Sequence, residues 1–216
     1  MLDFRQSLTN TYKSVTPREC MALVSLEHSK AAYRADFVLY CTVVVAMTAF
    51  LLVFGQRDQR LELAAVVLLG LVSWTVIEYA LHRFVLHGLQ PFRRWHTEHH
   101  VRPRALICTP TVLSGALIAT LVYLPALLVW NQWIADALTL GVLTGYLTYS
   151  VMHHASHHWR AETDWLKRRK KWHALHHQHV DHPRCYGVTT TFWDYVFGSA
   201  HRYPPCRTGP PVSSSP

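Results

Sequence analysis

The sequence lacks the cysteine patterns that build disulfide frameworks or zinc ribbons. Its 216 residues include five cysteines, an odd number, scattered without a Cys-x-x-Cys pair: Cys20, Cys41, Cys108, Cys185 and Cys206. A small disulfide-bonded scaffold uses an even set of cysteines, and a zinc ribbon uses closely spaced pairs. Both classes are therefore disfavoured.

A hydrophobic N-terminal leader is also missing, because residues 1–34 are polar and mixed in charge. We expect residues 1–15 to be poorly ordered. The segment Thr-Pro-Arg-Glu predicts a helix start, with Thr16 as N-cap and Glu19 closing a capping box. The helix that follows, up to about residue 34, is expected either at the membrane surface or packed as a short soluble helix on the rest of the chain.

Charged residues are nearly absent from four long stretches, which predicts four membrane helices because a span needs about 20 apolar residues. The expected helices cover residues 37–54, 61–87, 111–130 and 133–159. Pro125 is expected to kink the third. The second and fourth have 27 residues each, or about 40 Å, against a hydrocarbon core of about 30 Å. Their last turns should therefore project from the membrane.

The basic charge of the chain, formally +8, follows the predicted topology. Only Arg57 and Arg60 fall in the turn opposite the projecting helix ends, which leaves 19 of the 21 Lys and Arg on the other side. By the positive-inside rule, both termini and the projecting ends are predicted to be cytoplasmic, in a bacterial inner membrane or the endoplasmic reticulum. The basic run 167–171 is a candidate contact for anionic lipid or an acidic electron donor. No nucleic-acid partner is expected.

Histidine is abundant, and ten of the 16 histidines form two groups with the same layout. Each group pairs two histidines at the end of a long helix with a His-x-x-His-His triplet. The first holds His82, His87, His96, His99 and His100, and the second holds His153, His157, His173, His176 and His177. Residues three or four apart share a helix face, so each triplet is expected to present its rings in one direction. His82 and His87 are five apart, about 140° on a straight helix, so either the helix end loosens and they share one site, or they reach different metals.

Histidine is the commonest metal ligand, and ten exceed the four ligands of a structural zinc site. Two adjacent ions with open positions are therefore predicted. Imidazole suits Fe, Zn, Cu or Ni. Two redox-active ions beside a membrane suggest oxygen activation on a lipid. His154 and His158 are an alternative pair to His153 and His157, and four more histidines are expected at the surface or supporting the ligands: His28, His179, His182 and His201.

Glu78 is the candidate active-site residue outside the ligand set. It lies one turn before His82, so its carboxylate is expected to accept the imidazole N–H and orient the ring. The alternative is an interfacial, hydrogen-bonded glutamate without a role in the site. Glu98 and Asp181 would either support the ligands or be solvated.

The C-terminal part divides into an amphipathic close and a tail. Trp193 and Asp194 are predicted to be structural, with the indole packing the cap and the carboxylate capping a helix or pairing with a basic residue. Residues 201–216 are rich in Pro and Ser and are expected to be disordered. The predicted organisation is therefore a polar N-terminal segment, 1–34, a membrane domain, 35–200, and this tail.

The ordered histidines carry a resemblance to a known family. Over about residues 70–200 the chain resembles the fatty acid hydroxylase and sterol desaturase superfamily of membrane di-iron oxygenases. The stretch after His177 is more similar to the fatty acid 2-hydroxylases than to the sterol desaturases. The matching elements are His82-x4-His87, His96-x-x-His99-His100, His153-x3-His157, His173-x-x-His176-His177, Tyr186-Gly187-Val188-Thr189 and the segment from Phe192 to Gly198.

The resemblance implies an all-α integral membrane fold, with four transmembrane helices as two hairpins beneath a cytosolic histidine-rich cap. It implies ten histidine ligands for two iron ions, which zinc can replace in purified protein, with O2 as co-substrate. A separate cytochrome b5-like or ferredoxin-like protein would donate the electrons, because the His-Pro-Gly-Gly signature of a cytochrome b5 domain does not occur. The short gap between His87 and His96 trims the cap.

The predicted function is therefore hydroxylation of an unactivated C–H bond of a lipid. Its acyl tail would enter between the membrane helices, where Trp74, Tyr123, Tyr146 and Tyr149 are candidate lining residues or ordinary packing. Alternatives in the same superfamily are a sterol or lipid desaturase and a carotenoid hydroxylase. A non-enzymatic membrane metal store or transporter is a different class; a transporter would carry ionisable ligands at mid-membrane depth rather than at helix ends.

Overall fold

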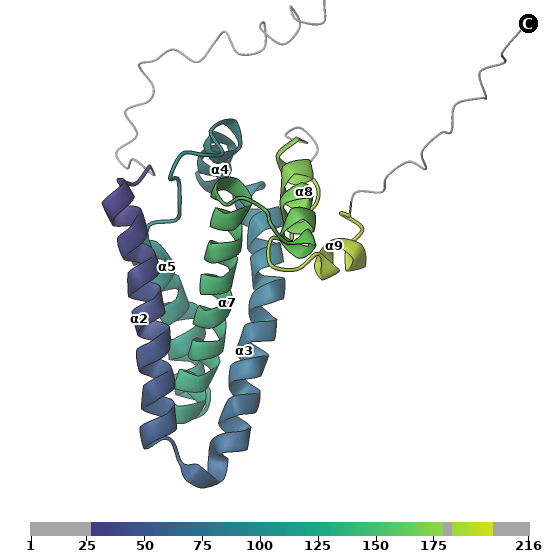
Figure 1. Cartoon of the computed structure of the whole chain (residues 1–216). Helices are drawn as coiled ribbons and strands as arrows, with labels where there is room; N and C mark the ends of the chain where they lie inside the picture. Colours follow the sequence, from purple (N-terminus) through teal and green to yellow (C-terminus); the bar gives the residue numbers. More distant parts are fainter. Residues whose placement is uncertain (1–26, 179–182, 201–216) are drawn as a thin grey trace, which may run out of the picture.

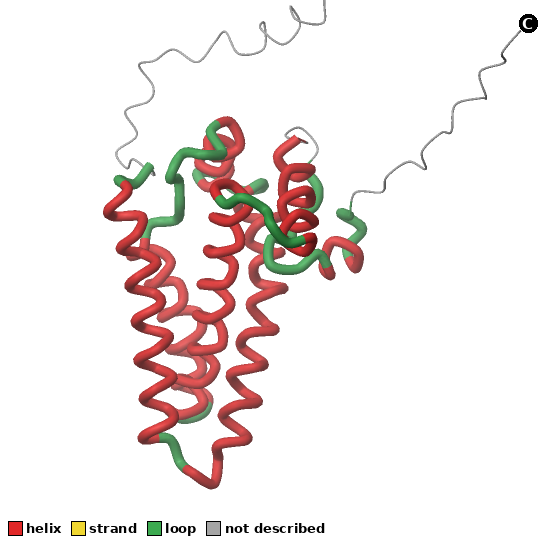
Figure 2. The backbone as a smooth tube through the Cα atoms, viewed as in Figure 1, coloured by secondary structure: helices red, strands yellow, loops and turns green. Residues whose placement is uncertain are grey.

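The computed structural model describes residues 27–178 and 183–200 of the chain. Apart from one isolated β-bridge, between Glu27 and Ile107, the regular structure in this part is helical (Figure 2). Four helical rods lie side by side (Figure 1). They are α2 (Lys30–Phe54), α3 (Arg60–Ala80) with its π-helical extension η3 (Leu81–Leu86), the interrupted rod α5 (Thr111–Ile118), η4 (Ala119–Tyr123) and α6 (Leu124–Val129), and α7 (Gln132–His158). All four are long and apolar enough to cross a membrane, which confirms the predicted helical fold with four candidate membrane spans.

Three shorter helices gather at one end of the rods and form a cap (Figure 1). These are α4 (Phe92–Val101), α8 (Asp164–Gln178) and α9 (Phe192–Val196). The rods form two hairpins, the first closed by the short helix η2 (Arg57–Gln59). In the second, the Asn131 side chain caps α7 by accepting a hydrogen bond from the Ile134 N–H at 3.0 Å. Both hairpins therefore direct their long helices, α3 and α7, toward the cap.

The first rod begins earlier than the sequence indicated. Ser29 is its N-cap, accepting a hydrogen bond from the Ala32 N–H at 3.1 Å. The predicted beginning at Phe37 is wrong because the charged residues Lys30 and Arg34 belong to the first turns of the same helix. The helix start predicted at Thr16 and the tail after residue 200 lie outside the described residues.

The third rod is interrupted just before its proline. Pro125 lies in the first turn of α6, and the preceding segment η4 is π-helical. Proline has no N–H to donate and its ring crowds the carbonyl of the preceding turn, so the hydrogen-bond ladder shifts there. Next to the proline, where a kink was predicted, the structure has a local π-helical segment.

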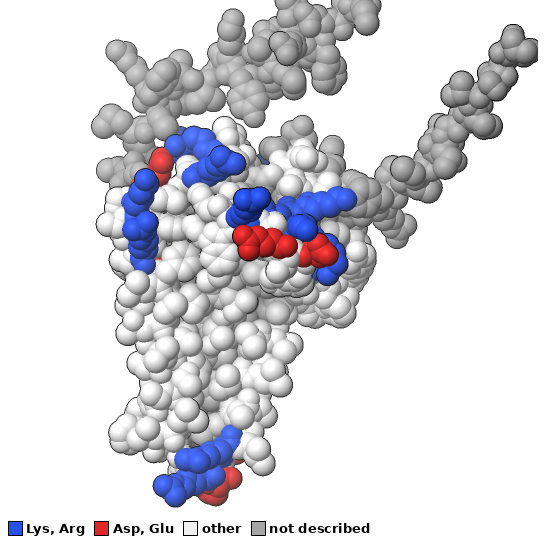
Figure 3. Space-filling view, in the orientation of Figure 1, with Lys and Arg blue, Asp and Glu red and all other residues white. Residues whose placement is uncertain are grey.

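Charge and apolar surface are separated along the rods. Among the described residues, Lys, Arg, Asp and Glu gather at the two ends, and the surface between them is uncharged in the view of Figure 3. Large apolar side chains stay exposed there, including Val45 at 67%, Leu52 at 63% and Leu128 at 77%. An apolar surface of this extent on a soluble protein would be an aggregation hazard, whereas in a membrane it contacts lipid.

Helices α3 and α7 touch backbone to backbone, and this contact positions the site. A Cβ atom on Gly141 would lie 2.1 Å from the Val67 carbonyl oxygen and 2.8 Å from the Gly70 Cα atom. Small residues allow such close approach between membrane helices. The same two helices carry His82 and His153 toward the cap, so the glycine contact sets the distance between the two halves of the histidine cluster.

Gly141→Ala is expected to destabilise the protein, because the new methyl group meets backbone atoms that cannot rotate away. Overpacking of this kind costs about 1–3 kcal/mol. Gly115→Ala is the matched control, since its Cβ would have only the Tyr40 hydroxyl within 4 Å, at 4.0 Å, and alanine favours a helix by about 0.5–1 kcal/mol. Thermal unfolding in detergent should show a lower midpoint for the first variant alone. Equal midpoints would contradict the tight contact.

Candidate metal centre

The ten predicted histidines converge where the rods meet the cap. They form two groups of five, and within each group one ring nitrogen per residue lies within 4.8 Å of the others. The first centre comprises His82, His87, His96, His100 and His176, and the second centre comprises His99, His153, His157, His173 and His177. Five neutral imidazoles gathered in this way can hold a metal ion.

The grouping in space differs from the grouping in sequence. His99 leaves its triplet and joins the second centre, where its Nε2 atom lies 3.0 Å from that of His153. His176 likewise joins the first centre, 3.2 Å from the His87 Nε2 atom. The expectation that each triplet presents its rings in one direction is therefore wrong. Adjacent helical residues diverge by about 100°, so the neighbours His99 and His100 point to different centres.

A π-helical turn brings His82 and His87 into the same centre. The His87 N–H donates to the His82 carbonyl at 3.2 Å, which is the five-residue hydrogen bond of a π-helix. The rings stack with centroids 5.3 Å apart and an interplanar angle of 28°. The hydrogen bond at the helix end thus spans five residues instead of four. This is the loosening that a site shared by His82 and His87 required.

The second helix-end pair lies on a regular α-helix, and of its two possible registers only one faces the cluster. His153 and His157 belong to the second centre, with ring centroids 4.8 Å apart. His154 and His158 stack on each other at 4.6 Å outside both centres. His154 also contacts the Tyr33 hydroxyl through Nδ1 at 3.1 Å.

Two backbone carbonyls fix the tautomers of the first centre. The Nδ1 atom of His82 lies 2.6 Å from the Tyr186 oxygen, and that of His176 lies 2.7 Å from the Arg184 oxygen. A carbonyl only accepts hydrogen bonds, so each Nδ1 carries the proton and each neutral ring turns a bare Nε2 inward. This is the usual way in which proteins orient metal-ligating histidines.

Several Nε2 atoms that point into the first centre lie at hydrogen-bond distance from one another. The protons available on neutral rings cannot satisfy all of these contacts. The Nε2 atom of His96 lies 3.0 Å from that of His82 and 3.1 Å from that of His100. A neutral imidazole has one proton, which cannot serve both contacts. Convergence of several lone pairs in a buried space is unfavourable without a cation, and this is the feature of the donor set that fits a metal ion.

Burial keeps these rings neutral. It lowers the pKa of His87 and of His99 to about 3, and that of His100 to about 4, with neighbouring histidines adding to the effect for His87 and His99. Desolvation disfavours the charged imidazolium, so the neutral form dominates at neutral pH. The nitrogens are therefore available as ligands without prior loss of a proton.

The turn that supplies the two carbonyls has an unusual backbone. Cys185, between Arg184 and Tyr186, has a φ of 58°, in the left-handed region that residues other than glycine rarely adopt. Asp194 holds this turn: its buried carboxylate accepts hydrogen bonds from the N–H groups of Tyr186 at 2.8 Å and Gly187 at 2.9 Å.

The role of Asp194 differs from the sequence-based expectation, whereas Glu98 matches the solvated alternative. Asp194 was expected to cap a helix or pair with a basic residue, but its carboxylate also accepts from the Trp172 indole at 3.2 Å and from the Ser199 hydroxyl at 2.7 Å. Asp194 belongs to α9, which begins only a few residues after the turn. Nothing in the local sequence pattern indicates that its side chain contacts the turn. Glu98, the other nearby acid, forms an exposed ion pair with Arg102.

Glu78 does not orient His82 as expected. Its Oε1 atom accepts hydrogen bonds from the N–H groups of Val188 at 2.7 Å and Thr189 at 3.0 Å, and its Oε2 atom accepts one from the Thr189 hydroxyl. The orienting partner of His82 is instead the Tyr186 carbonyl. Glu78 therefore influences the His82 ring indirectly, because it fixes the backbone that follows Tyr186.

The remaining candidates divide between the described residues and the rest of the chain. Trp193 donates its indole N–H to the Thr75 hydroxyl at 2.9 Å, which ties α9 to α3. His28 lies away from both centres, beside Cys108. Asp181, His179, His182 and His201 lie outside the described residues.

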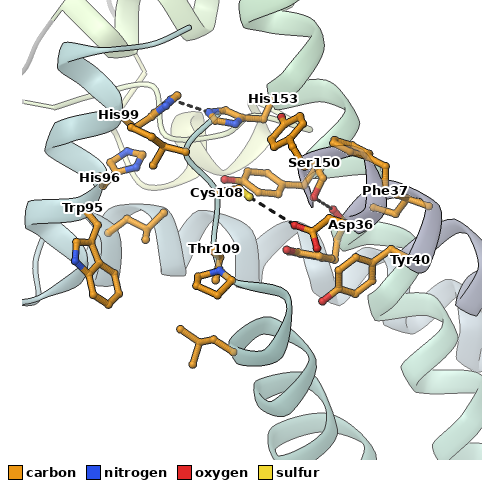
Figure 4. Close-up of a pocket in the computed structure, with 18 of the residues that line it drawn as sticks. Asp36, Phe37, Tyr40, Trp95, His96, His99, Cys108, Thr109, Ser150 and His153 are labelled. Atoms are coloured by element: carbon orange, nitrogen blue, oxygen red, sulfur yellow. Dashed lines mark hydrogen bonds between the residues drawn. The ribbon is translucent and has the colours of Figure 1, made fainter. Parts of the chain in front are cut away.

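A cavity of about 120 Å³ lies against both centres (Figure 4). His96 of the first centre and His99 and His153 of the second form part of its wall. Further walls come from α2, α5 and α7, mainly aromatic and apolar: Tyr33, Phe37, Tyr40, Leu113, Tyr146 and Tyr149. Tyr146 and Tyr149 were predicted candidates, whereas the α2 residues were missed because their approach to α7 depends on tertiary packing.

The comparisons with known proteins agree with this geometry. The chain is 33% identical over 149 residues to the dihydroceramide fatty acyl 2-hydroxylase FAH2 of Arabidopsis thaliana, which covers 64% of the chain and 61% of that protein. It is 33% identical over 145 residues to the ceramide very long chain fatty acid hydroxylase scs7 of Schizosaccharomyces pombe, covering 61% of the chain and 41% of that protein. The chain thus spans less than two thirds of the length of these relatives.

A solved structure and a family model extend the likeness. The structure described as full length scs7p, with only its hydroxylase domain visible, superposes with a TM-score of 0.69 at 27% identity, over 79% of this chain and 67% of that one. The family model for fatty acid hydroxylase matches residues 67–199, more than half of the chain and all ten clustered histidines. The chain belongs to the fatty acid hydroxylase family.

Proposed function

We propose that the chain is a membrane-bound non-haem di-iron oxygenase that hydroxylates an unactivated C–H bond of a fatty acyl chain in a lipid. The reaction consumes the lipid, O2, two electrons and two protons, and it yields the hydroxylated lipid and water. A separate protein supplies the electrons. The named activities of the related 2-hydroxylases support this choice over desaturation.

The observation that carries the proposal is the pair of five-nitrogen centres with inward lone pairs. Each centre offers more imidazoles than a four-ligand structural zinc site uses. Two ferrous ions held there would supply the reducing chemistry that activates O2 toward a C–H bond. The residues of the chain do the rest: the Tyr186 and Arg184 carbonyls hold His82 and His176 in the ligating tautomer.

The cavity beside the centres is the proposed site for the reacting part of the substrate. Its volume of about 120 Å³ is slightly less than that of an apolar cavity of about 150 Å³ that binds benzene, so it fits a short stretch of an acyl chain. His99 and His153 stand at one wall and aromatic side chains at the others (Figure 4). A bound chain would exclude water and present few carbons to the centres.

The membrane orientation and the electron donor are part of the proposal. The positive-inside distribution supports a cytoplasmic cap. The basic run that includes Lys167 and Lys171, on α8, lies on the cap and would attract an acidic donor protein. A metal transporter is less well supported, because the ligands lie at the helix ends and in the cap rather than along the rods.

Production of a hydroxylated lipid tests the function directly. We expect that cells expressing the chain together with an electron donor contain an acyl lipid heavier by one oxygen atom, detected by mass spectrometry of total lipid. Cells expressing His153→Ala serve as the control and should lack this product. Iron-loaded protein with no shift in any lipid class would favour metal storage or transport instead.

His99 and His176 each belong to the centre that the rest of their triplet does not join, and loss of either one should empty that centre. His99→Ala and His176→Ala each remove one of the residues exchanged between the triplets, so we expect metal per chain to fall by about half or more and activity to be lost. His158→Ala is the matched control, because this ring lies outside both centres. Metal analysis of purified protein measures the effect, and full iron content after either change would refute the ligand assignment.

Glu78→Ala should weaken metal binding by about 10–100-fold, the effect typical of residues that orient ligands. The change leaves two N–H groups without their acceptor and loosens the backbone next to Tyr186. Glu78→Gln should be much milder, because an amide oxygen still accepts from both groups and its NH2 donates to the Thr189 hydroxyl. Equal loss in both variants, measured by competition with a chelator, would mean that the charge itself matters.

A further inference from the structure

A third set of potential ligands lies outside the two histidine centres. His28 precedes α2, Asp36 lies on α2, and Cys108 lies in the loop before α5. One nitrogen, oxygen or sulfur atom of each lies within 4.8 Å of the other two. We propose that His28, Asp36 and Cys108 bind a divalent metal ion of the zinc type, at a site separate from the oxygen-activating centres.

The donor atoms already converge. The His28 Nδ1 atom lies 2.7 Å from the Cys108 Sγ atom, and this sulfur lies 3.7 Å from the Asp36 Oδ2 atom. Zinc bonds of about 2.0–2.3 Å in a tetrahedron place neighbouring ligand atoms roughly 3.3–3.8 Å apart. The sulfur–oxygen distance lies within this range. The nitrogen–sulfur distance is shorter than the range, as is the distance between the facing Nε2 atoms of His157 and His173 in the second centre. A small rotation of the His28 ring would open it.

The carboxylate is oriented for this role. The Thr111 hydroxyl donates to the Asp36 Oδ1 atom, which leaves Oδ2 directed at the sulfur (Figure 4). A hydrogen bond that holds the outer oxygen of a ligating carboxylate is a common support in metal sites. Imidazole, carboxylate and thiolate are all zinc ligands, and a thiolate favours zinc over magnesium or calcium.

The backbone holds the segments together independently of these side chains. The His28 N–H donates to the Leu106 carbonyl at 2.9 Å, and Glu27 forms a β-bridge with Ile107. The Arg102 guanidinium contacts the Glu27 carboxylate at 2.8 Å. The ligands are therefore brought together from distant parts of the sequence before any ion binds, which reduces the entropy lost on binding.

The order of the three groups argues against a cysteine nucleophile. In a catalytic Cys–His–Asp arrangement the carboxylate orients the imidazole, whereas here the Asp36 carboxylate contacts the Cys108 sulfur.

The location suggests what the ion does. Asp36 and Cys108 also line the cavity beside the histidine centres (Figure 4). An ion there would fasten α2 to the loop before α5 and so fix one wall of that cavity. Three protein ligands leave a fourth position for water or for an oxygen of a bound molecule.

Cobalt substitution tests the site without relying on activity, because the two histidine centres contain no sulfur. Full-length protein in detergent is stripped of metal and titrated with Co2+. We expect a thiolate-to-cobalt charge-transfer absorption in the near ultraviolet. Cys108→Ser should abolish it, and Cys41→Ser, which changes an exposed cysteine on the same membrane domain, should leave it unchanged.

Two further variants keep the test decisive if Cys108→Ser folds poorly. His28→Ala and Asp36→Asn retain the thiol and should weaken the Co2+ affinity read from this absorption by about tenfold or more. Absence of the sulfur–cobalt absorption in the unmodified chain would overturn the proposal, as would its survival in Cys108→Ser. Either result would leave the three residues as a hydrogen-bonded cluster and would not affect the proposed oxygenase function.

Discussion

The structure depends on two hydrogen bonds from histidine rings to backbone carbonyls, those of His82 and His176. Each bond fixes a proton on Nδ1 and so leaves the inward nitrogen as a lone pair. The rings come from η3 and α8, and the carbonyls come from one short turn before α9. The turn is thus held against η3, about a hundred residues earlier in the sequence, by the same kind of contact that prepares the ligands.

The unusual backbone of the turn that carries the two carbonyls explains the polar network around it. Buried carbonyls in a left-handed turn are poorly held by their own segment, so the turn needs external support. Asp194 binds the N–H groups of Tyr186 and Gly187, and Glu78 binds those of the next two residues, Val188 and Thr189. Both carboxylates are almost completely buried. Each carboxylate acts through the backbone. Residues that do not bind the metal themselves therefore contribute to metal affinity.

Much of the fold follows from local pattern in the sequence. Charge-free stretches and their lengths gave the four rods, and the predicted ends of α3 with η3 and of α7 agree with the structure to within one residue. The clustering of the ten histidines was also predictable, because four lie at the ends of these rods and six lie in the two His-x-x-His-His triplets that follow them. These features depend on neighbouring residues, which a single sequence displays.

The pairing of the ligands depends on long-range geometry and could not be read in the same way. Helical spacing places His96 and His100 together, but only the approach of α7 and α8 shows that His99 faces His153. The spacing of His82 and His87 left two outcomes open, and the π-helical turn decides between them. Glu78 was singled out because it lies one turn before His82, yet its hydrogen-bond partners lie more than a hundred residues away, beyond any local pattern.

The cavity shows how the two kinds of information combine. His96 and His99 of its wall belong to the cap, whereas His153 and most of the aromatic wall belong to the membrane rods, so its shape depends on how the cap sits on the rods. The glycine contact between α3 and α7 fixes the rods relative to each other, and the segments around His28 and Cys108 fix α2 relative to α5. A substrate chain lying between them would therefore meet the centres at a depth set by helix packing. Under the proposed function, selectivity for the position attacked would then reside in the packing of the rods, while the chemistry would take place where the rods meet the cap.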